Sequence, residues 1–277
     1  MCMDNQLQTN SRWSKVVLSL FAIAMIFQSS CVSPAPEQDA GTMLEPEADA
    51  GDNPVPFSDG GVAQLDAGSD QTGPADGFGE ISGSCGVLSE NLLADLTPSI
   101  IGNTIDFGNN PYDEADFDSL TSGGQEVIND GNAGGSSLYS EVFAFEVLSR
   151  CEDAELLKTE TEIAYTDPQG KLTDLLVQVR EIKLGVSVTR AVGFPREDPY
   201  TKDDARALLD QKLQGVLEST ANVAPEDAWS RQILYVIAYA QQHADSLNEA
   251  WEEVDVSLQS STILWVTVSD GDDEFLY

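Results

Sequence analysis

Residues 232–239 read Gln-Ile-Leu-Tyr-Val-Ile-Ala-Tyr (QILYVIAY), a continuous and largely apolar run. An uninterrupted apolar run, in place of alternating apolar and polar residues, is typical of a strand that is buried on both faces of a sheet. Residues 262–268 (TILWVTV) have the same character. These two segments predict core strands of a sheet that is flanked by helices.

The segments around these two strands alternate between helical and strand periodicity. They predict, in chain order, a helix at 136–151, strands at 156–165, 172–179 and 184–192, a helix at 201–219, and a helix at 245–253. A Pro and Gly turn at 167–170 separates the first two strands, and Thr201 is suited to cap the helix that follows it. The order α-β-β-β-α-β-α-β predicts the α/β class, with a mixed central β-sheet flanked by helices.

The charge of the chain is strongly negative and unevenly distributed. The 277 residues include 13 basic and 48 acidic side chains, for a formal net charge of −35. This charge repels phosphate backbones and disfavours nucleic acid as a partner. Eleven of the 13 basic residues lie between Arg150 and Arg231, so a site for an anionic ligand is expected in this middle part.

The first thirty residues have the pattern of a secretory signal peptide. Arg12 and Lys15 precede an apolar run of twelve residues, Val16 to Phe27, and small residues follow it. Twelve residues rise only about 18 Å as a helix, which is too short for a bilayer core of about 30 Å. The pattern predicts export.

Cys31 directly follows Ser29 and Ser30, and this arrangement resembles the lipobox of bacterial lipoproteins. The resemblance implies that Cys31 is lipidated and becomes the N-terminus of a protein anchored to a membrane of the bacterial cell envelope, on its periplasmic or surface face. Gln28 departs from the motif, which normally has an aliphatic residue there. The alternative is an ordinary signal peptide that is cleaved near Ser30.

Residues 31–83 are rich in Pro, Gly, Ala and acidic residues, and Asp-Ala-Gly recurs three times. Low hydrophobicity combined with uniform negative charge predicts a disordered linker. The predicted organisation is therefore a signal peptide at 1–30, a lipidation site and linker at 31–83, and a single α/β domain at 84–277 with its core at 136–268.

Cys85 and Cys151 remain after Cys2 is removed with the signal peptide and Cys31 is lipidated. An even pair in an oxidising compartment suggests a disulfide, and the alternative is two buried thiols. His243 is the single histidine and is expected near a helix start. Residues 108–135 are rich in Asp, Asn and Gly but match no EF-hand loop, so they are expected to form a long surface loop.

The predicted order from 136 to 268, with an acid on the first helix and Asp174 at the start of the second strand, resembles the PD-(D/E)XK superfamily of restriction-endonuclease-like proteins. The resemblance implies an αβββαβ core and a Mg²⁺ site for phosphodiester cleavage. Thr173-Asp174 corresponds to the Pro-Asp pair of the family, and Glu141 or Glu146 corresponds to its helix acid. In this chemistry carboxylates hold the metal while a lysine orients water.

The third motif of the family, acid-x-Lys, is degenerate here. A hairpin that turns between Glu181 and Ile182 would place Asp174 opposite Thr189, so Ser187-Val188-Thr189 would occupy the motif position. In that register Glu181 and Lys183 would fall in the turn, away from Asp174.

Residues elsewhere in the chain could take the two missing roles in the site that the resemblance implies. Glu162, which alternates with Glu160 along the predicted strand, could join Asp174 and Glu141 as a metal ligand. Lys212 or Arg190 could replace the missing lysine. An active Mg²⁺-dependent nuclease, a degenerate relative, and a non-catalytic surface lipoprotein whose α/β domain binds a partner all remain open.

Overall fold

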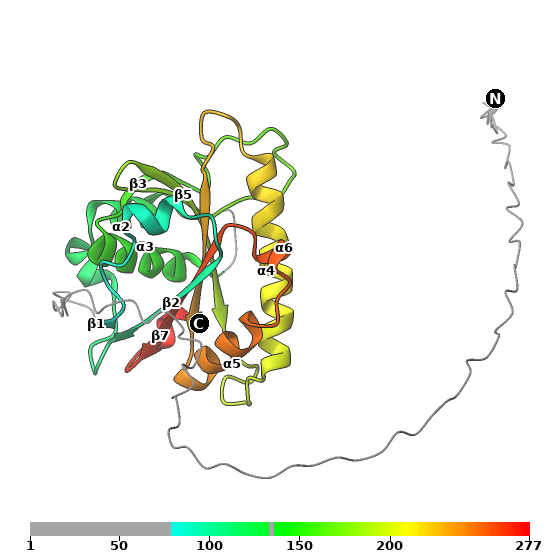
Figure 1. The fold of residues 1–277 in the computed structure, drawn as a ribbon. Coiled ribbons are helices and arrows are strands. Elements are labelled where there is room, and N and C mark those ends of the chain that lie inside the picture. The colour runs from blue at the N-terminus through cyan, green and yellow to red at the C-terminus, as the bar shows by residue number, and fades with distance from the viewer. Residues whose placement is uncertain (1–78, 133–135) are drawn as a thin grey trace, which may run out of the picture. The chain divides into compact units, whose positions relative to one another are not determined.

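The computed structural model describes residues 79–132 and 136–277, and within them a mixed seven-stranded sheet is flanked by helices on both faces (Figure 1). The strands are β1 Glu80–Gly83, β2 Ser99–Asp106, β3 Glu155–Thr159, β4 Leu175–Val179, β5 Ile182–Ala191, β6 Arg231–Ala238 and β7 Thr262–Asp270. Their order across the sheet is β1-β2-β7-β6-β5-β4-β3. The α/β class with a mixed sheet is therefore confirmed.

Parallel and antiparallel pairings divide the sheet. The central strands β2, β7, β6 and β5 pair in parallel, whereas β3, β4 and β5 form an antiparallel meander and β1 pairs antiparallel with β2. The helices that matter for the site are α2 Ser122–Asp130, α3 Leu138–Glu152, α4 Lys202–Asn222 and α5 Gln241–Trp251. From α3 to β6 the element order is αβββαβ, as the resemblance implies. The short helices are α1 Glu90–Ala94, α6 Val256–Gln259 and two 3-10 turns, η1 Glu114–Ser119 and η2 Glu274–Leu276.

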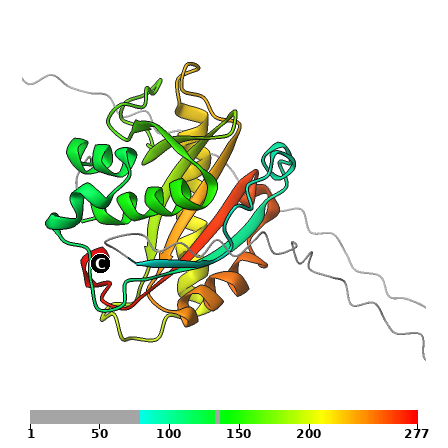
Figure 2. The same cartoon turned by 90° about the vertical axis from the view of Figure 1, so that its left-hand side faces the viewer.

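Two hydrophobic layers lie on opposite faces of the sheet. Helices α2 and α3 cover one face, and α4 and α5 cover the other (Figure 2). Strand β6 is buried along its whole length, with Ile233 and Tyr235 in the α3 layer and Leu234 and Val236 in the α4 layer. The unbroken apolar run of this strand follows from that burial on both faces.

Helix α4 begins as predicted. The Thr201 side chain accepts a hydrogen bond from the Asp204 amide, and the Asp204 carboxylate in turn accepts from the Thr201 amide. This reciprocal capping box satisfies backbone donors that the helix itself leaves unpaired. The helix continues to Asn222, three residues beyond the predicted end.

The N-terminal part of the described chain differs from the expectation in two ways. Strand β1 lies inside the predicted linker, because residues 80–83 pair with β2. The stretch 108–135, expected as a surface loop, contains the helix α2. Thr121 caps this helix through the Gly124 amide, and Gly123 and Gly124 allow α2 to approach α3 closely.

Residues 1–78 and 133–135 are outside the described residues, so the signal peptide, Cys31 and most of the linker are predictions from sequence alone. Within the described ranges, no helix has both the length and the apolar character that a membrane crossing requires.

Candidate functional site

Asp174 lies directly before β4 and is half-buried. One of its carboxylate oxygens, Oδ2, accepts the backbone N–H of Val188 at 2.7 Å. Val188 is the middle residue of Ser187-Val188-Thr189, the segment that was predicted to occupy the acid-x-Lys position. The structure therefore brings Asp174 beside the expected segment, and a backbone amide occupies part of its hydrogen-bonding capacity.

The β4–β5 hairpin register differs from the prediction by two residues. Leu175 pairs with Val186 and Val179 pairs with Ile182, so Arg180 and Glu181 form the turn. Arg180 has a φ of +55°, in the left-handed region that suits tight hairpin turns. The turn thus closes one residue earlier than expected, and continuing this register places Asp174 opposite Ser187.

A shift by two residues keeps every side chain on its predicted face, because the side-chain period of a strand is two. Ser187 and Thr189, both neutral, therefore stay on the face of the sheet on which the prediction placed them. The prediction that Lys183 falls in the turn is wrong, since Lys183 lies in β5 opposite Gln178. Its ammonium donates to the Glu226 carbonyl at 3.0 Å.

The pKa of Asp174 rises to about 7 in the folded protein, and burial of the carboxyl group is the largest cause of this increase. The hydrogen bond from Val188 opposes this increase, the negative charges of Glu141 and Glu160 add to it, and the positive charge of Lys212 opposes it. Two carboxylates and one lysine from other parts of the chain therefore act electrostatically on Asp174.

Glu141 is buried on the first turn of α3. Its Oε1 accepts hydrogen bonds from Ser137 Oγ at 2.8 Å and from Asn132 Nδ2 at 3.1 Å. Burial raises the pKa of Glu141, and these two hydrogen bonds oppose the increase. The carboxylate is thus held by neutral donors at the start of its own helix.

The strand that was predicted to run from 156 to 165 ends at Thr159, and a turn follows it. Glu160 and Glu162 therefore do not alternate along a strand. Glu160 acts electrostatically on Asp174, whereas the Glu162 carboxylate accepts the Thr159 amide at 3.1 Å. The turn directs the two acids to different neighbours.

Glu162 lies with Glu126 and Asp130 of α2, and one carboxylate oxygen from each comes within 4.8 Å of the others. This acidic trio is exposed and can hold a metal ion, because clustered carboxylate oxygens are ligands that hard divalent cations prefer. In the part of the chain that the structure describes, no group of three that includes Asp174 or Glu141 has this spacing. The residues around Asp174 therefore do not fit a preformed Mg²⁺ site.

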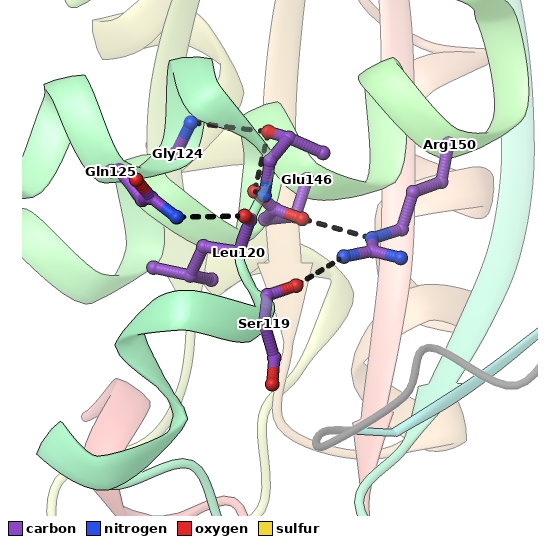
Figure 3. A network of polar contacts seen from close by, with 7 residues as sticks. Ser119, Leu120, Gly124, Gln125, Glu146 and Arg150 are labelled. Atoms are coloured by element: carbon purple, nitrogen blue, oxygen red, sulfur yellow. Dashed lines mark hydrogen bonds and ion pairs between the residues drawn. The ribbon is translucent and has the colours of Figure 1, made fainter.

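Glu146, the other candidate for the helix acid, has a structural role (Figure 3). It is fully buried, and its Oε1 accepts the Thr121 amide at 2.8 Å and the Thr121 hydroxyl at 2.7 Å. Its Oε2 pairs with Arg150 Nε at 2.9 Å, and Arg150 also donates to the Ser119 carbonyl. Glu146 thus joins α3 to the start of α2.

The two cations proposed to replace the missing lysine have different surroundings. Arg190 donates to the Leu276 carbonyl at 2.8 Å and to the Ser136 carbonyl at 3.3 Å, so it links β5 to η2 and to the segment before α3. Lys212 lines a cleft of about 220 Å³ that also contains Asp174. Lys171, Ser187, Gln211 and Gly215 line the same cleft.

Cys85 and Cys151 form a disulfide in the structure, with their Cα atoms 4.6 Å apart. Glu152, the next residue, accepts the backbone amides of Val87 and Leu88 at 3.0 and 2.8 Å. These contacts fasten the N-terminal segment to the end of α3.

His243 is the third residue of α5, near the helix start as predicted. It is buried, and neither ring nitrogen has a hydrogen-bond partner among the described residues. Its ring stacks on Tyr200 at a centroid distance of 4.9 Å. These surroundings agree with a packing role for His243.

The sequence did not single out Lys171 or Gly215, which line the cleft, nor Glu126 and Asp130 of the acidic trio. Glu126 and Asp130 are four residues apart, the spacing that places two side chains on one helix face. The many Asp, Asn and Gly residues of 108–135, which favour loops, outweigh that signal in the sequence. Lys171 and Gly215 had no local signal, since the cleft joins segments distant in the chain.

No protein-family model matches the chain. The chain is 40% identical over 164 residues to the AAC-rich mRNA clone AAC4 protein of Dictyostelium discoideum. The match covers 57% of this chain and 24% of that relative, so the chain spans about a quarter of the length of the relative.

Among solved structures, Pyrococcus furiosus SfsA in complex with Ca²⁺ aligns with 49% of this chain and 57% of that one. The TM-score is 0.26 and the sequence identity is 11%, a likeness too low to assign a family or an activity. The fold class rests instead on the sheet order and on the helices that cover its two faces.

Proposed function

We propose that this protein is an exported, lipid-anchored protein of the bacterial cell envelope, whose restriction-endonuclease-like domain binds a ligand beside Asp174 without cleaving phosphodiesters. The absence of phosphodiester cleavage is inferred from the residues at the position of the acid-x-Lys motif. Neutral Ser187 and Thr189 flank the amide that holds Asp174, where the family resemblance calls for an acid and a lysine.

The surroundings of Asp174 support the absence of hydrolysis. Two-metal or one-metal phosphodiester cleavage needs carboxylates that converge on the ion and a group that activates water. Here Glu141 is held by Ser137 and Asn132, and Glu162 belongs to the acidic trio with Glu126 and Asp130. The negative charge of the chain also disfavours a nucleic-acid substrate.

One observation favours the alternative, a Mg²⁺-dependent phosphodiesterase. The charges of Glu141, Glu160 and Lys212 all act on Asp174, so two further carboxylates and a lysine belong to its electrostatic surroundings. In that case Asp174, Glu141 and Glu160 would hold the metal, and Lys212 would orient water.

Calorimetry with Mg²⁺ and Mn²⁺, together with cleavage assays on DNA and RNA, separates the two functions. The purified protein is compared with Asp174→Asn and with Glu126→Gln, which removes one acid of the trio. We expect no cleavage, and any heat of metal binding should be lost in Glu126→Gln but kept in Asp174→Asn. Metal-dependent cleavage that disappears in Asp174→Asn would establish the nuclease and reject our proposal.

A further inference from the structure

The side chains of Lys171 and Lys212 differ from the other basic side chains of the described residues. Eleven lysines and arginines lie in the described ranges, and nine of them donate a hydrogen bond or form an ion pair within the protein. These nine are Arg150, Lys158, Arg180, Lys183, Arg190, Arg196, Lys202, Arg206 and Arg231. Among the described residues, the side chains of Lys171 and Lys212 have no such partner.

Both of these lysines line the same cleft, the one that contains Asp174. On a chain with 48 acidic residues, ion-pair partners are abundant, so two lysines that line one cleft without such a partner are unexpected. Asp174 offsets one of the two positive charges, and its Oδ2 is bonded to the Val188 amide. The two ammonium groups therefore retain N–H donors from which a bound anion can accept hydrogen bonds.

Gly215 provides a second, independent observation. It lies inside α4, where glycine is less favourable than alanine because a glycine loses more backbone conformational freedom on folding. A Cβ atom built at Gly215 would meet no atom within 4 Å. At Gly124 of α2, by contrast, a Cβ atom would lie 2.1 Å from Glu146 Oε1, so packing requires that glycine.

Packing within the described residues therefore does not explain Gly215, which lines the cleft beside Lys212. Its missing side chain leaves that part of the cleft open. A second hollow, of about 500 Å³, includes Phe194 and shares Gln211 with this cleft. Phe194 is 98% exposed and offers an apolar surface in this second hollow.

We propose that the cleft between β5 and α4 binds a small organic anion, with Lys171 and Lys212 holding its phosphate or carboxylate group and the space above Gly215 receiving the adjoining part. This inference rests on the proposed function as a ligand-binding domain and names the class of ligand. A volume of about 220 Å³ suits a small molecule, not a nucleic-acid strand.

The test measures binding of inorganic phosphate and of succinate to the purified full chain by calorimetry. Four variants accompany it: Lys171→Gln, Lys212→Gln, Gly215→Phe to fill the cleft, and Lys202→Gln as the matched control. Lys202 lies on the same helix but pairs with Glu253, so its loss changes the net charge equally without touching the cleft.

We expect one of the two anions to bind and each cleft lysine variant to weaken binding about tenfold, the usual scale for a charge-assisted hydrogen bond. Lys202→Gln should bind like the unmodified protein. Gly215→Phe should abolish binding, and if that variant does not fold, the two lysine variants decide alone. A stronger response to phosphate assigns a phosphate-bearing ligand, and a stronger response to succinate assigns a carboxylate.

Two results would overturn the inference: no binding of either anion, or equal weakening in Lys202→Gln and Lys212→Gln. Cleavage assays on the same samples separate this failure from failure of the proposed function. Absence of anion binding without cleavage rejects only the ligand class, whereas phosphodiester cleavage rejects the proposed function itself.

Discussion

Replacing Asp174 by Asn should stabilise the protein at high pH and leave its stability unchanged at low pH. Asn is isosteric with Asp, and its Oδ1 can still accept the Val188 amide. The substitution therefore removes the charge while it keeps the hydrogen bond. What changes is the free energy required to ionise a partly buried carboxyl group.

The magnitude follows from the pKa of Asp174, which rises from an ordinary value of 3.8 to about 7 in the folded protein. This difference corresponds to at most about 4 kcal/mol, and solvent in the cleft reduces it, so we expect about 2 kcal/mol. Because the folded-state pKa is the higher one, the folded state binds the proton more tightly than the unfolded state. The contribution of Asp174 to stability is therefore full below pH 3.8 and is lost as the pH rises through about 7.

Urea unfolding at intervals between pH 4 and pH 9 measures this effect as the difference between Asp174→Asn and the unmodified protein. The difference should be near zero at pH 4 and should grow through pH 7 in favour of the variant. Asp198→Asn is the control, because Asp198 is exposed and its loss changes the net charge equally. A difference that does not vary with pH, or one that Asp198→Asn reproduces, would refute the reasoning.

Four further predictions concern other parts of the molecule. Burial lowers the pKa of His243 below 6.5, so the protein should lose stability as the pH falls through 6.5, and His243→Phe should flatten urea-unfolding stability between pH 5 and pH 7. Glu146→Ala should lower the free energy of unfolding by about 3 kcal/mol in urea titrations, because it leaves buried donors and a paired arginine without their acceptor. Reduction of the Cys85–Cys151 disulfide, which closes a loop with a sequence separation of 66, should cost about 4 kcal/mol measured by unfolding with and without reductant. Cys31→Ser should abolish lipid labelling and move the protein from the membrane fraction to the soluble fraction, and an unchanged distribution would reject the lipoprotein prediction.

Several features of the fold could be predicted from local sequence. The apolar run of β6, the capping box at Thr201 and the chain order from α3 to β7 all depend on residues a few positions apart. Helix and strand periods and capping hydrogen bonds are short-range properties, so the sequence alone determined the α/β class. The same local pattern missed α2, because its glycines resemble a loop and are explained only by the close approach of α3.

The site was decided by the tertiary structure. A turn that begins at Arg180 instead of one residue later moves the β4–β5 register by two residues. The end of β3 at Thr159 gives Glu160 and Glu162 different neighbours. Side chains from a loop, a strand and a helix meet in the cleft only after the sheet has formed. The sequence alone determined that the chain is acidic, that its basic residues lie in the middle, and that Asp174 precedes a strand. Only folding placed Lys171, Lys212 and Gly215 in one cleft, because that cleft depends on contacts between segments about forty residues apart.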